Sequence, residues 1–370
     1  MKPLVLCLLH LPPPDYGVTL FNQKIISGLL SEEFSLKTLA INTSRRLEDI
    51  ERFSFSKIAV FLCAWFNLLG LLSRSRYALC YFSITPTGAA FYRDILFVGL
   101  LKAFRVKILY HLHGKGISRQ KGKLTKALYK WCFRNACLIQ LSPVLFYDIQ
   151  DYARKQDVFV LPNGIEDACA GKFSDCRGAR SREHKVNILF LSNMVKSKGV
   201  FDLLEAASII KAKGYNFRLV FAGAWFDITA EEFDQRVKEF RLENETAYLG
   251  FKKGVEKDAI FMAADIFVYP TRNDTFPLVL LEALHWGLPV ISTREGGIPD
   301  IIDDNFNGFL ISPGDVKTLA ERIEVLINDR GLRERMGFAG REKFLSEYTF
   351  DRCQNRLRDI FNKVVKLCAV

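Results

Sequence analysis

Two carboxylates and two lysines in this chain have the spacing expected of a site for a charged ligand. Asp274 precedes an apolar run, and Glu282 lies inside that run among leucines and alanines. Lys196 and Lys198 stand just before another helical pattern. A carboxylate among apolar side chains is costly unless a partner satisfies it. Lysines beside a helix N-terminus form an anion pocket. We therefore expect a partner on Glu282 and an anion of about diphosphate size near the lysines.

The local pattern around Glu282 predicts one strand–helix–strand unit. A strand ends at Pro270, Pro277 suits the first turn of a helix, and Gly287 suits the end of that helix. The β-branched run 290–293 predicts the next strand, and Gly296-Gly297 a turn after it. In such units ligands bind where strand carboxyl ends meet helix N-termini. Asp274 falls in that position.

The same alternation of strand and helix patterns covers the chain and predicts parallel α/β sheets. The expected strands are 4–9, 36–41, 79–84, 107–112, 137–141, 158–161, 186–191, 217–222, 248–250, 266–269, 290–293 and 309–312. The expected helices are 20–30, 56–72, 88–104, 121–134, 144–153, 199–213, 229–241, 255–263, 277–287, 315–328, 332–347 and 351–367.

A polar stretch without periodicity, 165–185, interrupts the alternation and is typical of a linker. A chain of 370 residues also exceeds one typical core. We expect two doubly wound Rossmann-like domains facing across a cleft. We expect residues 1–182 to form the first domain with the linker, residues 183–350 the second domain, and residues 351–370 a C-terminal helix that can pack back on the first domain.

The cysteine pattern argues against a metal site and favours reduced thiols. The nine cysteines include no C-x-x-C pair, and no histidine cluster has metal-ligand spacing. A disulfide between Cys169 and Cys176 is the alternative. The N-terminal residues lack a cleavage-site pattern and predict a strand. The sequence therefore predicts a cytoplasmic protein with reduced thiols.

The stretch 274–299 resembles the signature of the family 4 retaining glycosyltransferases of GT-B fold. The shared features are a carboxylate, seven residues, a glutamate, then small-x-Gly-x-Pro-Val and a Gly-Gly loop. Lys198-Gly199 resembles the family's phosphate-binding pair. Tyr16-Gly17-Val18, His113-Gly114 and Pro162-Asn163-Gly164 occur in the expected order. The resemblance implies a retaining enzyme that uses a UDP- or GDP-sugar and needs neither metal nor other cofactor.

The resemblance also implies roles for single residues. Glu282 would accept hydrogen bonds from ribose hydroxyls, and Asp274 would face the donor sugar. Lys198 would stabilise the leaving diphosphate, and Gly17 would let the backbone approach it. Further donor contacts are expected at Asn193, Lys196, Gly223, Leu249, Phe276, Pro277 and Leu278.

His113 is expected to hydrogen-bond the donor sugar and so completes the catalytic set with Lys198, Asp274 and Glu282. His111 is the second choice. We expect it to face the core, on the argument that alternate strand residues point to opposite sides.

Two positions depart from the family pattern. Asp274 replaces the usual glutamate and is one methylene shorter. Asn193 stands where many members have arginine. Either Lys196 supplies that missing charge or one phosphate contact is lost.

Basic charge is concentrated in the first half of the chain. Residues 1–182 carry net +13 and residues 183–370 net −2. The stretch 115–134 has seven basic residues and no acid. The apolar run 58–72 is shorter than the roughly 20 residues of a membrane span. Together these features suggest docking of the first domain on the inner face of the cytoplasmic membrane, with a lipid-linked saccharide as acceptor. Helix 56–72 as a fully buried core helix is the alternative.

Two other functions compete with this one. An epimerase-like enzyme acting on nucleotide-sugars would use the same architecture, and the Asp274/Glu282 spacing with Lys198 disfavours it. A nucleic-acid binder is suggested by charge alone. The aromatics of the basic stretch, Tyr129, Trp131 and Phe133, have helix spacing that favours core packing over base stacking. We therefore expect no nucleic acid partner.

Overall fold

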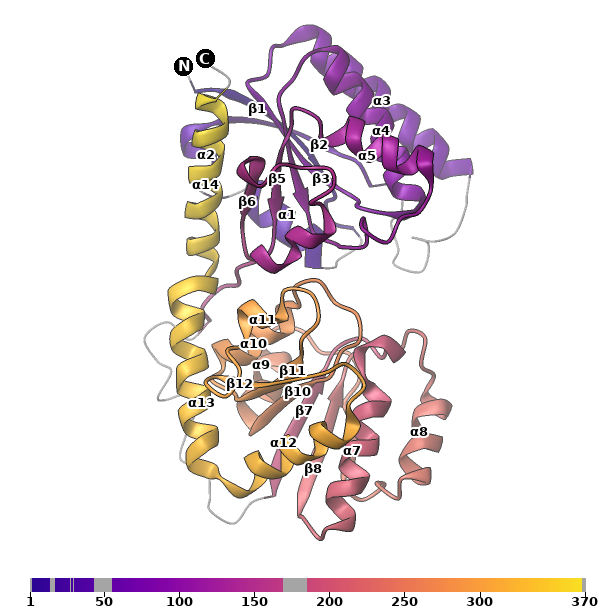
Figure 1. Ribbon diagram of the computed structural model, residues 1–370, viewed down its shortest axis with the longest axis vertical. Coiled ribbons are helices and arrows are strands. Elements are labelled where there is room, and N and C mark those ends of the chain that lie inside the picture. The colour runs from indigo at the N-terminus through magenta and orange to yellow at the C-terminus, as the bar shows by residue number, and fades with distance from the viewer. Residues whose placement is uncertain are drawn as a thin grey trace. The chain divides into compact units, whose positions relative to one another are not determined.

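The computed structural model describes residues 2–13, 17–26, 28, 30–42, 55–168 and 185–367. The chain divides into two compact units, one made of residues 1–163 with 351–370 and one of residues 164–350. Each holds a six-stranded sheet in which all pairings are parallel (Figure 1). The predicted fold class, two doubly wound Rossmann-like domains, is confirmed.

The sheet of the first unit has the order β2-β1-β3-β4-β5-β6. Its strands are short apolar runs, nearly all buried in β1, β3, β4 and β5 because helices cover both faces. The strands are β1 Leu4–Leu9, β2 Ser35–Ala40, β3 Leu79–Ile84, β4 Ile108–Leu112, β5 Cys137–Gln140 and β6 Val158–Val160. The helices are α1 Gly17–Ile26, α2 Leu30–Glu33, α3 Phe55–Arg74, α4 Gly88–Ala103 and α5 Lys123–Phe133, with 3-10 turns η2 Pro143–Asp148 and η3 Lys155–Asp157.

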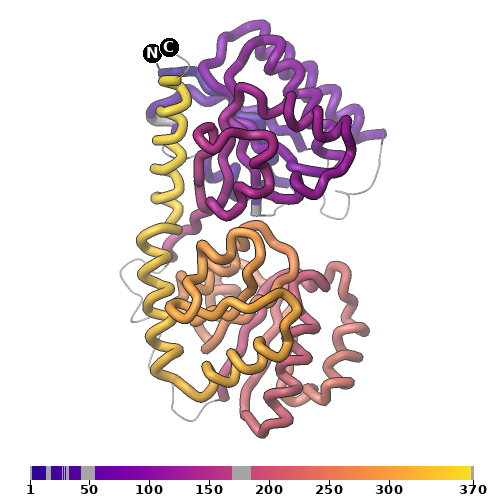
Figure 2. The backbone as a smooth tube through the Cα atoms, viewed as in Figure 1, coloured from indigo at the N-terminus to yellow at the C-terminus, as the bar shows by residue number. Residues whose placement is uncertain are grey.

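Two separate cores flank this sheet. Helices α3, α4 and α5 pack on one face. On the other face α1 and α2 pack together with α14, Phe350–Lys366, at the far end of the chain. Figure 2 shows α14, in yellow, running beside the first unit. The Phe34 and Phe361 rings meet edge to face at 5.5 Å, and Asn362 Nδ2 donates to Glu33 Oε2 at 2.8 Å. The last helix therefore completes the core of the first unit.

The sheet of the second unit has the order β12-β11-β10-β7-β8-β9. Its strands are β7 Val186–Leu191, β8 Phe217–Ala222, β9 Thr246–Tyr248, β10 Ile266–Tyr269, β11 Val290–Thr293 and β12 Gly308–Ile311. The helices are α7 Val200–Ala212, α8 Ala230–Glu239, α9 Val255–Ala263, α10 Leu278–His285, α11 Ile298–Ile301, α12 Val316–Asn328 and α13 Arg330–Lys343, with a 3-10 turn η4 Lys196–Lys198 and a π-helical turn η5 Phe344–Tyr348. Strand order reverses between β7 and β10, which is where ligands bind in open parallel sheets.

Some local predictions differ from the structure. The helix predicted at 144–153 is only the 3-10 turn η2, since Asp148 accepts hydrogen bonds from the neighbouring loop 116–118. The strand expected at 248–250 ends at Tyr248. Helix α11 was not predicted, because four residues carry no readable period. Residues 165–168 of the expected linker belong to the second unit, which begins at Gly164. Cys169 and Cys176 lie outside the described residues.

Candidate active site

The loops that follow β7 and β10 lie against each other at the reversal point of the second sheet. Ser197 carbonyl oxygen accepts a hydrogen bond from the Arg272 N–H at 2.7 Å. Gly199 has φ +80°, and a Cβ there would lie 2.2 Å from the carbonyl oxygen of Pro270. Only glycine fits such an approach without moving the backbone. The glycine of the lysine–glycine pair is thus required by the packing of these two loops.

Lys198 and Asp274 form an ion pair between these loops. Lys198 Nζ lies 2.6 Å from Asp274 Oδ2 and 3.0 Å from the carbonyl oxygen of Asn273. The Tyr269 hydroxyl donates to the same Oδ2 at 2.7 Å, and the Thr275 N–H donates to Oδ1 at 2.8 Å. Burial, and next the Asp274 charge, raise the pKa of Tyr269 well above its usual value, so it remains a donor. The carboxylate is therefore held in one orientation.

Glu282 has a partner that the sequence did not reveal. Lys257 Nζ, from the first turn of α9, lies 2.6 Å from Glu282 Oε1 on α10. Burial raises the pKa of Glu282, and the Lys257 charge opposes that rise. The two residues are 25 positions apart on different helices, so no sequence spacing links them. The ion pair answers the question of how a carboxylate is tolerated in this apolar run.

The N-terminus of α10 directly follows the loop that carries Asp274. No side chain caps it, and Pro277 stands at the N-cap with φ −71°, not within the first turn as predicted. The first N–H groups of a helix lack intrahelical partners, and Leu278 supplies the first of them here. Phe276 is buried, 4% exposed, with its ring edge-on to Tyr348 at 6.1 Å. Its side chain therefore anchors the loop.

Glycines before and after β11 adopt positive φ. Gly287, at φ +60°, follows the C-cap residue Trp286, as predicted for the end of this helix. Gly296 has φ +55°, and a Cβ there would lie 2.4 Å from the carbonyl oxygen of Asp274. The Gly297 N–H donates to the carbonyl oxygen of Thr275 at 2.7 Å. The Gly-Gly turn after β11 thus supports the loop that carries Asp274.

The other predicted donor contacts of this unit lie on adjoining loops. Asn193 is exposed just after β7. Lys196 Nζ is 2.9 Å from Glu232 Oε1 on α8, so its charge is paired away from Asp274. Gly223, at the end of β8, would place a Cβ 1.7 Å from the carbonyl oxygen of Ser192, and its N–H donates to the carbonyl oxygen of Gly250 at 3.0 Å.

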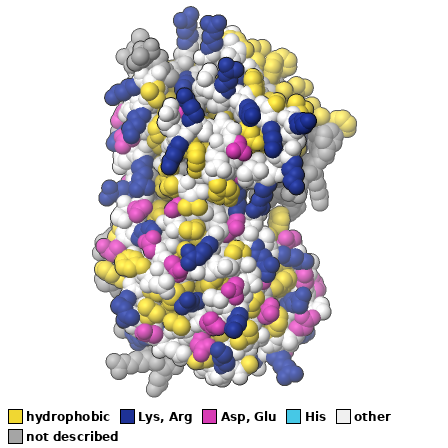
Figure 3. Space-filling view, viewed as in Figure 1, with side chains coloured by type: hydrophobic (Ala, Val, Ile, Leu, Met, Phe, Trp, Pro, Cys, Tyr) yellow, Lys and Arg dark blue, Asp and Glu magenta, His cyan; other side chains and the backbone are white. Residues whose placement is uncertain are grey.

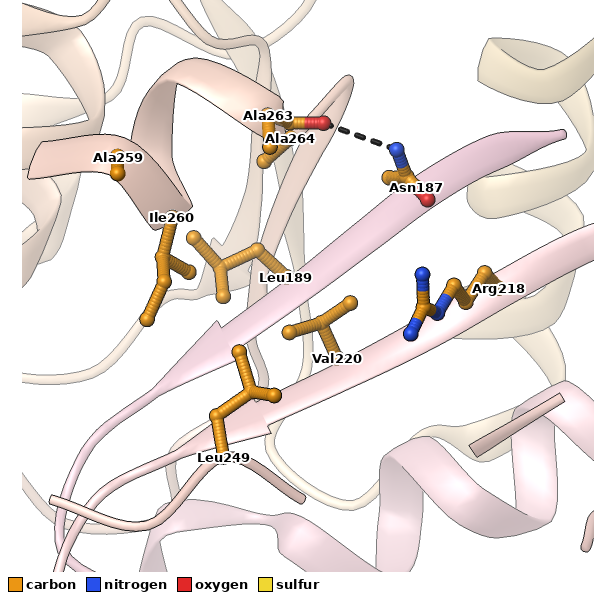
Figure 4. Close-up of a pocket in the computed structure, with 9 residues that line it drawn as sticks. All are labelled: Asn187, Leu189, Arg218, Val220, Leu249, Ala259, Ile260, Ala263 and Ala264. Atoms are coloured by element: carbon orange, nitrogen blue, oxygen red, sulfur yellow. Dashed lines mark hydrogen bonds between the residues drawn. The ribbon is translucent and has the colours of Figure 1, made fainter. Parts of the chain in front are cut away.

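A cavity of about 220 Å³ lies between the sheet and α9 (Figure 4). Leu249, a predicted donor contact, lines it together with alternate residues of β7 and β8, such as Leu189 and Val220. Arg218 is its only charged lining residue, and neither Lys198 nor Glu282 belongs to it. The cavity is thus a mostly apolar space next to the loop after β9. Within the described part of the chain, no three His, Cys, Asp or Glu side chains are grouped as metal ligands.

The two histidines at the end of β4 in the first unit lie beside one another. Their rings are 3.9 Å apart, and both meet the ring of Phe21, at 5.7 Å from His111 and 5.4 Å from His113. The argument that put them on opposite sides was wrong, because residues two apart in a strand share a face. His111 is fully buried, and its Nδ1 lies 2.6 Å from the Tyr81 hydroxyl. Helix α1 begins at Gly17, inside the stretch 15–19 from which the sequence predicted a loop leading into a helix.

His113 presents an unsatisfied nitrogen. Its Nε2 is buried with no hydrogen-bond partner among the described residues. Burial, with the nearby charge of His10 as the smaller cause, lowers the pKa of His113 to about 3, so the ring is neutral at pH 7. The loop after it is held by Asp148, which accepts from the N–H groups of Gly116 at 2.8 Å and Ser118 at 2.9 Å. His113 is thus a neutral, positioned hydrogen-bonding group.

Three residues that support the site were missed in the sequence: Lys257, Tyr269 and Asp148. Tyr269 is the last residue of a predicted strand, a position from which a side chain can reach the following loop. Nothing in the spacing of Lys257 or Asp148 indicates their partners, which come from distant parts of the chain.

The second half of the chain is similar in sequence to known glycosyltransferases. Residues 176–343 match the family model described as Glycosyl transferases group 1. A capsular polysaccharide biosynthesis glycosyltransferase, CapM of Staphylococcus aureus, is 31% identical over 177 residues, covering 48% of this chain and 46% of CapM. An N-acetyl-alpha-D-glucosaminyl L-malate synthase of Bacillus anthracis is 29% identical over 180 residues, which cover 48% of this chain and 46% of the synthase. The match thus spans about half the length of these relatives.

Solved structures resemble the chain over nearly its whole length. A glycosyltransferase from Rickettsia africae has a TM-score of 0.77 at 18% identity, covering 99% of each chain. Anabaena Alr3699/HepE, solved in complex with UDP, has a TM-score of 0.74 at 16% identity, covering 98% of this chain and all of that one. Residues 176–343 are thus similar to the Glycosyl transferases group 1 family, and the chain as a whole has the fold of these solved structures.

Proposed function

We propose that the protein transfers a sugar from a UDP- or GDP-sugar to a growing saccharide, with retention of anomeric configuration. The observation that carries this proposal is the Lys198–Asp274 ion pair at 2.6 Å across the reversal point of the second sheet. It places a positive charge, a carboxylate and the uncapped N-terminus of α10 at the edge where parallel sheets bind ligands. The positive charge and the helix N-terminus can bind a diphosphate, and the carboxylate can accept a hydrogen bond from a sugar hydroxyl.

In the reaction proposed here, the bond between the donor's anomeric carbon and its diphosphate oxygen breaks as an acceptor hydroxyl oxygen bonds to that carbon from the same side. The proton of that hydroxyl passes to the leaving diphosphate oxygen. Negative charge grows on the diphosphate, and Lys198 with the N–H groups of α10 stabilises it. Asp274 accepts from hydroxyls of the donor sugar. Glu282 accepts from the ribose, sharing its carboxylate with Lys257. His113 donates to or accepts from the sugar as a neutral ring.

We further propose that the reaction needs no metal ion or other cofactor, because lysine and helix N–H groups supply the positive charge that the leaving diphosphate requires. The acceptor that we propose is a lipid-linked saccharide in the synthesis of a surface polysaccharide or glycoconjugate. The capsular polysaccharide role in the name of the S. aureus relative supports this pathway class.

A ligand panel followed by turnover tests the proposal. Thermal shift with UDP, GDP and ADP, each with EDTA, should raise the melting temperature with one base preferentially, since a ligand of the folded state stabilises it. Turnover of the matching sugar nucleotide should then require an added saccharide acceptor. Conversion of the sugar nucleotide without any acceptor would instead indicate an epimerase-like enzyme. Absence of any nucleotide-dependent shift would refute the proposed donor class.

A further inference from the structure

Helix α3 turns an apolar face to solvent. It is 20 residues long with a mean hydropathy of 1.8, and no charge lies between Lys57 and Arg74. Only 17% of its most apolar window is buried, through Ala64, Leu68 and Leu72. The helix is thus not the fully buried core helix that was the alternative in the sequence.

Four of the exposed apolar residues of α3 form one stripe, while Val60, 48% exposed, lies on another side of the helix. Phe55, Ile58, Leu62 and Phe66 follow one another at helical spacing and are 82, 42, 45 and 61% exposed. A solvent-facing helix surface normally carries charged or polar side chains, and contiguous exposed apolar patches mark interaction sites.

The stripe continues onto the two neighbouring helices. Trp65 Nε1 on α3 donates to the carbonyl oxygen of Leu96 on α4 at 3.3 Å, and Leu96 is half-exposed. The Tyr92 hydroxyl of α4 lies 2.8 Å from Thr125 Oγ1 of α5. On α5, Leu124 and Trp131 are exposed. We call the surface of Phe55, Ile58, Leu62, Phe66, Tyr92, Leu96, Leu124 and Trp131 the α3–α5 face.

The charged side chains around the α3–α5 face are almost all basic. Residues 55–134 contain fourteen Lys and Arg and a single acid, Asp94. Asp94 is buried and lies 2.6 Å from Arg93 Nη2, so it contributes no exposed negative charge. Exposed lysines on α5 include Lys123, Lys126 and Lys130. In Figure 3 dark blue side chains predominate over the first unit, and yellow ones gather at the edge of the view over α3.

We propose that the α3–α5 face docks on an anionic lipid bilayer, with the α3 stripe at the boundary between headgroups and acyl chains. A bilayer accounts for both the apolar stripe and the lysines. The aromatic and aliphatic side chains enter the membrane interface, and the lysines contact anionic headgroups. The partner is a lipid surface and not a protein, because the charged residues among the described residues 55–134 are all basic apart from the buried Asp94.

Helix α3 lies in the interface and does not span the membrane. Its other side belongs to the core of the first unit, where the Phe61 and Phe97 rings meet at 5.2 Å. Spanning would pull Leu68 and Leu72 out of that core and expose the sheet beneath. The protein therefore binds peripherally.

Vesicle flotation of the full chain tests this inference without any sugar substrate, so its result is independent of the proposed reaction. The protein should float with vesicles of phosphatidylglycerol and phosphatidylcholine and not with phosphatidylcholine alone. L62D/F66D should lose more than about tenfold in partition coefficient, because two apolar side chains leave the interface. K126A/K130A should lose roughly 20-fold, and high salt should have a similar effect.

Matched controls come from exposed residues of the second unit. F338D changes an equally exposed phenylalanine, and K317A an exposed lysine; both should float like the unmodified protein. Thermal melting checks that every variant is folded. In the unmodified protein, bromine-labelled acyl chains should quench tryptophan fluorescence, and W131F should reduce that quenching.

Two results would overturn the inference. The first is flotation that does not differ between anionic and neutral vesicles, or that is unchanged in L62D/F66D. The second is retention of the protein in membranes after alkaline carbonate extraction, which releases peripheral proteins and would show that α3 spans the bilayer.

Discussion

Lys198 Nζ and Asp274 Oδ2, 2.6 Å apart, join the loop after β7 to the loop after β10 in the second unit. The two strands are neighbours in the sheet. Lys198 Nζ also contacts the carbonyl oxygen of Asn273, which is 75 residues away in the sequence. The pair therefore holds the lysine in place before a ligand arrives. A diphosphate would find it already positioned.

Lys198→Ala should lower kcat by roughly 100-fold or more while weakening nucleoside diphosphate binding much less, because stabilisation of the leaving group is realised in the transition state. Steady-state kinetics and calorimetry separate the two effects. Lys196→Ala serves as the control, since that lysine pairs with Glu232 on the surface. If the variant lost nucleoside diphosphate affinity but kept its kcat, Lys198 would contribute to ground-state binding and not to stabilisation of the leaving group.

Glu282→Ala should reduce nucleoside diphosphate affinity by about 10- to 100-fold, as expected for loss of hydrogen bonds to a charged group. The variant also leaves Lys257 without its partner. Calorimetry measures the affinity. Glu256→Ala changes an exposed acid one residue from Lys257 and should bind normally. Unchanged affinity in Glu282→Ala would argue against the ribose role.

Tyr269→Phe should lower kcat/KM by roughly 5- to 50-fold. The Asp274 carboxylate accepts hydrogen bonds from two neutral donors, the Tyr269 hydroxyl and the Thr275 N–H, and the loss of the first would let Asp274 move more freely. Tyr269 acts here as a positioning residue. The nucleoside diphosphate affinity should stay nearly constant, since the ring and its packing remain. A purely structural role would instead lower the melting temperature with kcat/KM preserved in the folded fraction.

Gly199→Ala should destabilise the second unit by more than the about 1–2 kcal/mol that positive φ alone costs an alanine. The added Cβ would meet the Pro270 carbonyl oxygen at 2.2 Å. Gly214→Ala is the matched control, because Gly214 has nearly the same φ, +85°, and a Cβ added there would meet no atom within 4 Å. Chemical denaturation measures both. Equal losses would mean that the two loops can move apart freely.

Acid should destabilise the first unit through its buried histidines. Burial lowers the pKa of His10 and His113 to about 3 and that of His111 well below its usual value. The unfolded chain, with histidine pKa near about 6.5, binds more protons below that pH, so stability falls as pH drops from about 6.5 toward 3. Each such histidine contributes about 1.4 kcal/mol per pH unit.

Melting temperatures across a series of buffers from neutral to mildly acidic pH measure this dependence. His113→Asn should show a shallower loss, because one titrating group is gone from the unfolded state. A slope identical to that of the unmodified protein would show that His113 is protonated in the folded state.

The sequence by itself determined the strands, the two-sheet architecture and the position of the active loops. Runs such as 79–84 and 266–269 are apolar, short and bounded by turn residues, so their local pattern suffices. Gly199 and Gly296 could also be recognised, since a glycine next to a helix or turn indicates an unusual backbone. These features depend on residues close in sequence.

Only the tertiary structure decided which side chains meet. Lys257 and Glu282 come from different helices, and Asp148 reaches back about 30 residues to hold the loop after His113. The shared face of His111 and His113, and the outward turn of the α3 stripe, follow from how elements pack against a sheet. Periodicity shows that a helix has an apolar side, but only its packing decides whether that side is buried or exposed to solvent.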